Sequence, residues 1–501
     1  MRPLPRRAYS WCQPLSRANV ITRLTAAELA TKLANRELSA VEVTQAHLDR
    51  IAAMDGDFGA FLTVTAEAAL AQAESAQVKL NAGIGGPLTG IPIALKDNMS
   101  TKGVRTTCAS QILRDYIPPY SATVVDRLQD AGAVCLGKTN LDEFAMGTST
   151  ENSSFQLTRN PWDVERSPGG SSGGSAAAVT AEFSPLSLGS DTGGSIRQPA
   201  ALCGIVGFKP TYGRCSRYGL IAFGSSLDQI GPFARSVEDI ALVSEAITGH
   251  DPRDGTSINM PPISSRDLKS GSLKGLKAAL PKEFFGESMH PDVLAAVNRS
   301  VEELRREGVE FEEVSIPSIA YGVTTYYLIA PAEASSNLAR FDGVRYGPRS
   351  QGAGHIDVVE MTRAHGFGHE VKTRIMIGTY ALSAGYYDAY YVKAQQVRAL
   401  MQREFAQVFQ KYDLIVGPTS PIPAFKLGEL TNDPMALKLL DYCTIPANML
   451  GSPAISLNCG LADGLPVGIQ LMGAPLRDEQ LLQAAYGVER ALGASVRPPL
   501  A

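Results

Sequence analysis

The sequence predicts an α/β fold in which a mostly parallel or mixed β-sheet is covered by helices on both faces. Short apolar runs, typical of buried strands, alternate along the chain with segments of helical periodicity. The chain of 501 residues is 44% hydrophobic and 19% charged, which is the composition of a globular protein of enzyme size. No internal repeat or linker-like segment divides it. These observations favour one large domain with inserted helices over several small domains.

Six apolar runs are the candidate strands of this sheet. They are Ile91–Lys96, Ala131–Leu136, Leu186–Leu188, Leu414–Gly417, Ala454–Leu457 and Gly468–Met472. Capping-box patterns at Thr25 and Ser39 predict the first two helices. Residues 290–310 and 383–411 are also expected to be helical. Residues 252–275 are rich in proline, serine, aspartate and glycine, so we expect an irregular surface segment there.

We expect one folded domain, residues 24–495, with inserted helical segments. An N-terminal extension, residues 1–23, is expected to be disordered, and a short tail, residues 496–501, ends the chain. The extension is rich in arginine and lacks acidic residues, which is the composition of a mitochondrial transit peptide. Its prolines would interrupt an amphipathic helix, so a basic tail or an upstream start codon in a bacterial gene is the alternative. The expected location is the bacterial cytoplasm, or the mitochondrial matrix if the extension is a targeting peptide.

Composition argues against several kinds of protein. The net charge of −4 does not favour binding to nucleic acid or to an anionic membrane. The seven cysteines are scattered and form no CxxC pair, which argues against a disulfide framework and a zinc site and fits a reducing compartment. No apolar run approaches transmembrane length. We therefore expect neither a metal nor a membrane partner.

Two loops rich in glycine and serine, Gly169–Ala178 and Asp191–Ala200, are the most informative part of the chain. Dense glycine is entropically costly, so a packed domain concentrates it where the backbone must approach something closely. The core-like residues around these loops argue against a flexible linker. In the second loop, the N–H groups leading to Ser195 can point at one oxygen, as in an oxyanion hole. The predicted oxyanion-hole residues are Thr192, Gly193 and Gly194.

Three residues are candidates for a nucleophilic centre: Ser195, Ser171 and Lys96. A serine hydroxyl needs a base to take its proton, and the six histidines lie in no recognisable triad motif. A lysine replaces histidine as the base if burial lowers its pKa. Lys96 ends an apolar run where burial is plausible. An exposed lysine, or one paired with Asp97, is an equally open interpretation at this point.

A nucleotide-binding motif has to be weighed against these loops. Gly132–Thr139 matches the pattern GxxxxGK[ST] of a P-loop. The residues between its glycines are Ala, Val, Cys and Leu, which favour a buried strand rather than a phosphate-binding turn. His365 and His369 have the i, i+4 spacing of metal ligands, but the glycines between them disfavour a metal-binding helix. Ser195 does not lie in a GxSxG elbow, which disfavours an ordinary α/β-hydrolase.

Lys96 and the two loops resemble the amidase signature family. Ser171 and Ser195 are 24 residues apart, and Lys96 precedes Ser171 by 75, as the family pattern expects. The resemblance extends from about Leu24 to Leu492, and it implies the α/β/α fold with a large mixed sheet. Within the family, four segments are most similar to the A subunits of tRNA-dependent amidotransferases. These segments are residues 136–147, 333–343, 370–376 and 385–391.

The resemblance implies a role for each member of the centre. Ser195 is the expected nucleophile, and Ser171, which follows a cis Gly170–Ser171 peptide bond, is the expected proton relay. Lys96 is the expected neutral base. The N–H groups of Thr192 to Ser195 are expected to hold the oxyanion. The other serines of the loops are then expected to be structural; they are Ser172, Ser175 and Ser190.

The resemblance also implies a glutamine-binding site. Arg374 is placed on the substrate carboxylate, Asp441 on its amino group and Tyr326 along its side chain. Arginine suits a carboxylate because its planar fork binds both oxygens. From the residues alone, ordinary ion pairs would be the preferred interpretation of these positions.

The implied function is a glutamine-hydrolysing amidase subunit that releases ammonia for amidation of Glu-tRNA(Gln), or of Asp-tRNA(Asn). This subunit is expected to need no cofactor, while a partner subunit binds ATP, magnesium and the tRNA. A small third subunit completes the expected heterotrimer. The alternative is a stand-alone amidase acting on another small amide.

Overall fold

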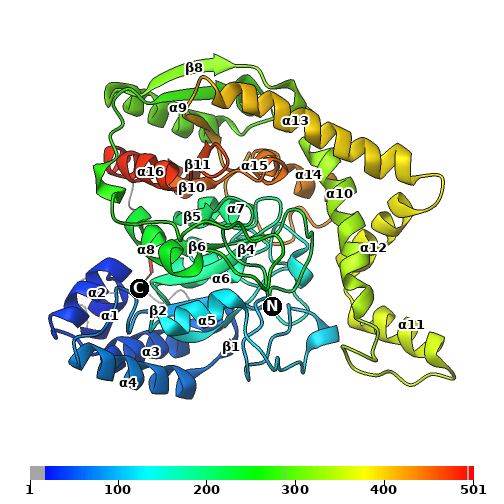
Figure 1. The fold of residues 1–501 in the computed structure, drawn as a ribbon, viewed down its shortest axis with the longest axis horizontal. Helices are drawn as coiled ribbons and strands as arrows, with labels where there is room; N and C mark the ends of the chain where they lie inside the picture. The colour runs from blue at the N-terminus through cyan, green and yellow to red at the C-terminus, as the bar shows by residue number, and fades with distance from the viewer. Residues whose placement is uncertain (1–16, 287, 494–495, 501) are drawn as a thin grey trace, which may run out of the picture.

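The computed structural model describes residues 17–286, 288–493 and 496–500. Within that part of the chain, one eleven-stranded sheet has the order β1-β3-β2-β4-β6-β5-β10-β11-β9-β7-β8. Figure 1 shows the sheet running through the body, with β1 at one end and β8 at the other. The strands are β1 (Phe61–Val64), β2 (Pro92–Lys96), β3 (Val134–Thr139), β4 (Leu186–Asp191), β5 (Val206–Lys209), β6 (Gln229–Ala234), β7 (Lys277–Pro281), β8 (Glu310–Val314), β9 (Leu414–Pro418), β10 (Ala454–Ala462) and β11 (Leu465–Gly473).

The sheet is mixed, as predicted. β2 runs parallel to both β3 and β4, and β7 runs parallel to both β8 and β9. Between these two parallel groups the neighbouring strands are antiparallel, from β4 through β6, β5, β10 and β11 to β9. The parallel pair β2–β4 is the part of the sheet that matters most for the site described below.

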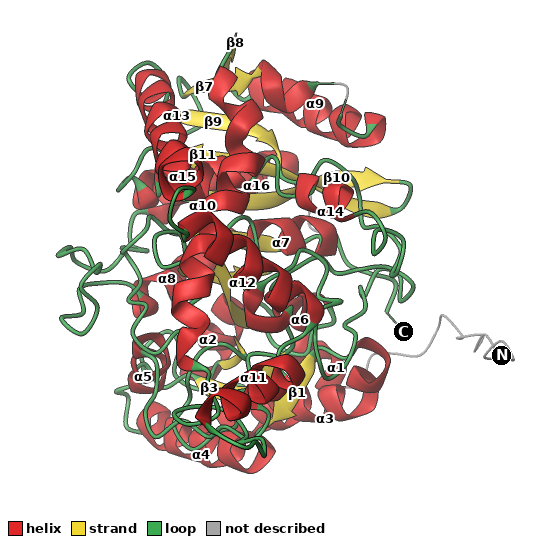
Figure 2. Cartoon of the chain, turned by 90° about the vertical axis from the view of Figure 1, so that its right-hand side faces the viewer, coloured by secondary structure: helices red, strands yellow, loops and turns green. Residues whose placement is uncertain are grey.

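Helices cover both faces of the sheet, because alternate residues of its strands point to opposite sides. On β6, Ile230 and Ala234 join one core with α8 (Val237–Ile247), whereas Phe233 joins the residues of α6 and α7 on the other side. α9 and α16 pack on the same face of the sheet as α8. α10, α13 and α15 pack on the opposite face of the sheet, which α7 also covers. Figure 2 shows α10 and α12 in front of the strands, on the side of α6 and α7.

The other helices complete the two outer layers and confirm the predicted sandwich. The remaining bounds are α1 (Arg17–Thr22), α2 (Ala26–Ala34), α3 (Ala40–Phe58), α4 (Ala66–Asn81), α5 (Thr123–Asp130), α6 (Gly173–Thr180), α7 (Arg197–Cys203), α9 (Pro291–Arg306), α10 (Gly322–Asn337), α11 (His355–Gly366), α12 (His369–Leu382), α13 (Lys393–Phe409), α14 (Pro434–Leu439), α15 (Ile445–Leu450) and α16 (Asp478–Leu492). The capping box at Thr25 is present, and Ser39 caps α3 through its side chain.

The predicted start of ordered structure is wrong for one short segment. Residues 17–22 of the expected disordered extension form α1, which packs against α3. The reason is burial, since Ile21 is only 3% exposed and joins the main core. An ion pair from Arg17 to Glu42 of α3 also holds the helix, at 2.6 Å. Residues 1–16 lie outside the described part of the chain.

Across the described ranges, no helix combines the length and the apolar character needed to span a bilayer.

Candidate active site

Lys96 lies at the end of a central strand, β2, in which every residue is buried. Its Nζ lies 2.8 Å from Ser171 Oγ. Asp97 pairs instead with Lys138, at 3.2 Å. Both simpler interpretations of Lys96, exposure and pairing with Asp97, are therefore excluded. The structure brings Lys96 and Ser171 together, across 75 residues of sequence.

Two further serines contact the same amine. The Nζ of Lys96 lies 2.8 Å from Ser172 Oγ and 3.0 Å from Ser190 Oγ. The expectation that Ser172 and Ser190 are only structural missed these contacts. Ser175 donates its hydroxyl to a strand carbonyl instead. Three hydroxyl groups thus hold the amine. In the sequence, Ser172 is marked only by its place beside Ser171, and Ser190 only by its place at the end of a buried strand.

The environment of Lys96 favours the neutral amine. Burial lowers its pKa to about 7, because an ammonium group loses its hydration inside the protein. Charged neighbours, including Asp142 and Asp191, raise the pKa and offset only part of that effect. A neutral amine has a lone pair that accepts a proton. Lys96 therefore has the properties of a base near neutral pH.

The two glycine–serine loops pack against each other. The Gly170–Ser171 peptide bond is cis. The N–H of Gly170 donates to Gln198 Oε1 at 3.0 Å. Gln198 lies in α7, which begins two residues after Ser195. This bond places the turn that carries Ser195, itself 6% exposed, beside the loop that carries Ser171.

The turn from Thr192 to Ser195 offers free hydrogen-bond donors. The N–H groups of Gly193, Gly194 and Ser195 have no hydrogen-bond partner within the residues that the structure describes. Gly194 has φ +145°, and a Cβ there would lie 2.2 Å from Thr444 Oγ1, so the turn requires glycine. Successive free N–H groups in a tight turn can stabilise an oxyanion.

A buried ion pair brackets this turn. Arg197, just after it, donates from Nε and Nη2 to Asp191, just before it, at 3.0 Å each. Burial by itself would raise the pKa of Asp191, but the ion pair with Arg197 lowers it to about 2. Thr192, the first predicted oxyanion residue, also donates its hydroxyl to Asp228 at 2.7 Å. The turn is thus held at both ends before any substrate binds.

Tyr326 and Asp441 lie against the turn. A Cβ on Gly193 would lie 2.8 Å from Cζ of Tyr326, and one on Gly194 would lie 3.2 Å from Asp441 Oδ1. Asp441 Oδ1 is buried with no hydrogen-bond partner among the described residues. Burial raises the pKa of Asp441 well above its usual range. A cationic ligand would supply the missing donor and lower that pKa again.

Arg374, the residue expected to bind the substrate carboxylate, is a buried cation. It lies on α12, is 5% exposed, and its Nε lies 2.7 Å from Glu370 Oε1. Its guanidinium carbon lies 5.5 Å from the ring centre of Phe223 and 5.1 Å from that of Tyr327. The charge of Arg374 acts on Asp441, whose pKa it lowers against the effect of burial. A buried acid thus lies against the glycine turn, and a buried cation lies near enough to that acid to lower its pKa.

The other motifs of the sequence do not form a second site of this kind. Lys138 of the P-loop-like segment lies in β3, is fully buried, and donates to Met99 O and Thr106 Oγ1. The segment is a strand, as predicted, rather than a phosphate-binding turn. His365 lies in the last turn of α11, and His369 begins α12. Among the described residues no group of three or more histidine, cysteine or acidic side chains is arranged to hold a metal.

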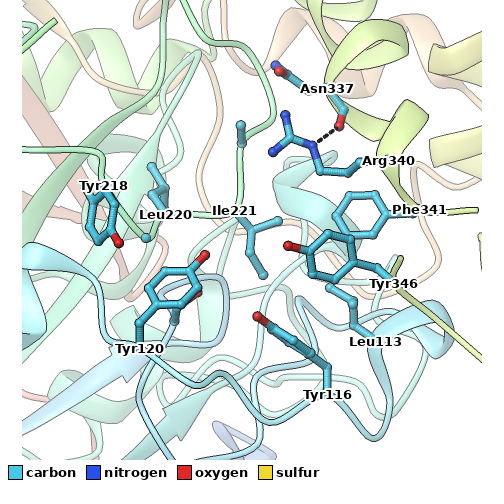
Figure 3. Close-up of a pocket in the computed structure, with 13 residues that line it drawn as sticks. Leu113, Tyr116, Tyr120, Tyr218, Leu220, Ile221, Asn337, Arg340, Phe341 and Tyr346 are labelled. Carbon is cyan, nitrogen blue, oxygen red and sulfur yellow. Dashed lines mark hydrogen bonds between the residues drawn. The ribbon is translucent and has the colours of Figure 1, made fainter. Parts of the chain in front are cut away.

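A separate cavity of about 200 Å³ lies outside the predicted site (Figure 3). Tyrosine rings line it, and the pair Tyr116 and Tyr346 is 5.8 Å apart at the ring centres. Asn337 on its rim donates to Phe223 O at 3.0 Å, the residue whose ring lies under Arg374. The cavity is therefore a neighbour of the site, and none of the predicted site residues lines it.

Comparison with known proteins agrees with the geometry. The model of the Amidase family matches residues 42–482. The A subunit of the glutamyl-tRNA(Gln) amidotransferase of Moorella thermoacetica is 58% identical over 468 residues, which cover 93% of this chain and 96% of that protein.

Solved structures have the same fold. The chain resembles the crystal structure of the A subunit of the glutamyl-tRNA(Gln) amidotransferase from Thermotoga maritima, with a TM-score of 0.79 and 45% identity over 94% of this chain and 95% of that one. It also resembles the native peptide amidase from Stenotrophomonas maltophilia, with a TM-score of 0.80 and 31% identity over 95% of this chain and 98% of that one.

Proposed function

Because this chain belongs to the Amidase family, we propose that it is the glutamine-hydrolysing A subunit of a tRNA-dependent amidotransferase. One observation carries the choice of glutamine. The buried, unpartnered acid Asp441 lies against the glycine turn next to the candidate nucleophile, and the buried cation Arg374 acts on the pKa of that acid. An α-amino acid with a side-chain amide carries the two opposite charges that this pair can bind. The relatives described above, which include subunits of that name, support the same choice.

Ser195 is the proposed nucleophile. Its Oγ attacks the side-chain amide carbon of glutamine, its proton passes to Ser171 Oγ, and the proton of Ser171 passes to Lys96 Nζ. The free N–H groups of the glycine turn hold the negative oxygen that forms. When the intermediate collapses, the C–N bond breaks, and the amide nitrogen takes the proton back from Lys96 through Ser171 and leaves as ammonia.

Water completes the reaction. The glutamyl ester on Ser195 is attacked by a water molecule whose proton follows the same route to Lys96. Breaking the ester bond releases glutamate and returns a proton to Ser195. The neutral form of Lys96, favoured by burial, serves as acceptor in both halves of the reaction.

The partners are part of the proposal. Ammonia passes to a second subunit that binds the misacylated tRNA and uses ATP with magnesium to activate its glutamyl or aspartyl group. A small third subunit completes a heterotrimer, and this chain itself needs no metal or cofactor. The proposal places the complex in the bacterial cytoplasm, with the mitochondrial matrix as the alternative location.

The test is a pull-down of the co-expressed partners, followed by an assay for glutamine-dependent conversion of Glu-tRNA(Gln). We expect the complex to amidate the tRNA with glutamine as donor, and the Ser195→Ala complex to do so only with added ammonia. A lone chain that turns over aryl or acyl amides, and gains nothing from partners, would instead identify the stand-alone amidase. Parallel reactions with Asp-tRNA(Asn) separate the two tRNA substrates.

A further inference from the structure

The carboxyl group of Glu143 joins two distant parts of the chain. Glu143 begins a short 3-10 helix (Glu143–Ala145) and is 1% exposed. Its Oε2 accepts from the N–H of Gly368 at 2.8 Å, and its Oε1 accepts from the hydroxyl of Ser110. Gly368 is the N-cap residue of α12 and has no side chain to cap the helix. Glu143, 225 residues away, accepts a hydrogen bond from the N–H of this N-cap residue, the bond that an N3 carboxylate makes in a capping box.

The fit at this cap is close. A Cβ on Gly368 would lie 2.4 Å from Glu143 Oε2, so a larger residue there would displace the carboxyl group from its present position at the helix end. Ser110 Oγ also lies 3.2 Å from Gly366 O, on the other side of the turn between α11 and α12. Burial raises the pKa of Glu143 to about 7, and the bonds from Ser110 and Gly368, with the partial positive charge of the helix N-terminus, offset part of that effect.

The neighbours of Glu143 attach the cap to the candidate catalytic centre. The N–H of Asp142 donates to Ser171 O at 3.2 Å. On the other side, the ring of Phe144 lies 4.9 Å from that of Phe341 and 5.6 Å from that of Phe367, which lies in the α11–α12 turn. Three consecutive residues thus connect the proton relay with the start of α12.

The backbone around this connection is strained. Phe144 and Ala145 have φ of 51° and 60°, and Cys108 and Ala109, just before Ser110, have φ of 53° and 54°. Residues with side chains rarely adopt this left-handed conformation, and they keep it only where the surroundings over-determine it. The N–H of Phe144 donates to Cys108 O at 3.0 Å, so the two strained segments support each other.

We propose that Glu143, held by Ser110, is a positioning residue that sets the place of α12 and thereby of Arg374 at the glutamine carboxylate. This inference rests on the proposed function. Arg374 lies six residues into the helix from Gly368, about 9 Å along its axis. A helix transmits displacement of its capped end along its length, and the ion pair of Arg374 with Glu370 keeps the guanidinium on the same helix. Glu143 then acts on glutamine affinity through Arg374 and not by contact.

The test is a double-mutant cycle in the complex purified with its partners. The variants are Glu143→Gln, Arg374→Ala and the combination, and the readouts are KM and kcat for glutamine together with the melting temperature. Glu143→Gln is expected to raise the KM for glutamine about tenfold while kcat stays within about twofold. Distant, independent sites have additive effects. We expect no such additivity, because once Arg374 is absent, Glu143→Gln should change KM by less than about twofold.

Two more variants separate positioning from folding. Glu489→Gln is the matched control, since the carboxylate of Glu489 also accepts one backbone N–H, that of Val237, at 2.9 Å. It does not touch α12, so its KM should equal that of the wild type. Ser110→Ala removes one hydroxyl that holds Glu143 and should raise KM in the same direction as Glu143→Gln. It covers the case in which Glu143→Gln fails to fold.

The outcomes distinguish this inference from the function on which it rests. If the wild-type complex hydrolyses no glutamine, the proposed function is overturned and the inference with it. If the wild type is active but the effects of Glu143→Gln and Arg374→Ala on KM simply multiply, only the positioning role is overturned. The same holds if Glu143→Gln and Ser110→Ala lower the melting temperature and kcat and leave KM unchanged.

Discussion

The protonation state of Lys96 makes the sharpest prediction, which concerns the pH dependence of glutamine hydrolysis. Lys96 accepts the proton of Ser171 only as a neutral amine. Burial lowers its pKa to about 7, so protonation removes the acceptor as the pH falls through that value. The rate therefore rises with pH across neutrality and reaches a plateau on the alkaline side.

The size of the effect follows from a single ionisation. With a pKa of about 7, kcat/KM at pH 7 is about half of its plateau value, and at pH 6 about a tenth. At pH 8 it is within about 10% of the plateau. An unperturbed lysine, with a pKa near 10.5, would leave the rate still rising tenfold per pH unit at pH 8.

The assay is ammonia release from glutamine by the partner-bound enzyme, measured from pH 5.5 to 9. Lys209 provides the matched control, because it is also fully buried, its pKa is also lowered to about 7, and it donates to backbone carbonyls away from Ser171. Lys209→Met should leave the midpoint unchanged. A profile without a break between pH 6 and 8, or a midpoint that moves with Lys209→Met, would refute the assignment of Lys96 as the base.

Three further predictions follow from the site. Arg374→Ala should raise the KM for glutamine about 10- to 100-fold, the value of a lost charge-assisted pair, without changing that for a small uncharged amide; equal effects in steady-state assays would place the carboxylate elsewhere. Gly194→Ala should lower kcat at least about 100-fold, because its Cβ would meet Thr444; a normal kcat would remove the turn from the mechanism. Lys138→Ala should lower the free energy of unfolding by about 3–5 kcal/mol, since it leaves Asp97 buried without its cation; denaturant titration measures this, and an unchanged midpoint would contradict the buried pair.

The strands that sequence reasoning found are the ones whose surroundings are apolar on both faces. β2, β4 and β9 are short apolar runs covered by helices, so composition alone identifies them. β8 was missed because it is an exposed edge strand of mostly charged residues. β6 was missed because Gly231 and Pro232 interrupt its apolar pattern, although every residue in it is buried.

The candidate site, like the fold, has features that the sequence identifies and features that only tertiary packing creates. The glycine–serine loops and Lys96 could be selected from the sequence, but the burial of Lys96 could not, because it depends on the strands that flank β2. The pairing of Asp97 with Lys138 likewise exists only across neighbouring strands. The positions of Tyr326, Arg374 and Asp441 carry no local pattern and came from family resemblance. The approach of Tyr326 and Asp441 to the glycine turn is a result of tertiary packing.

The central claim is that Ser195 carries the glutamyl group during hydrolysis of glutamine. The most direct measurement is mass spectrometry of the partner-bound enzyme after rapid acid quenching with glutamine, followed by peptide mapping. The proposed mechanism predicts one added glutamyl group on the peptide that contains Ser195, and its absence in Ser195→Ala. A glutamyl group on Ser171 or on any cysteine, or steady hydrolysis by Ser195→Ala, would contradict it.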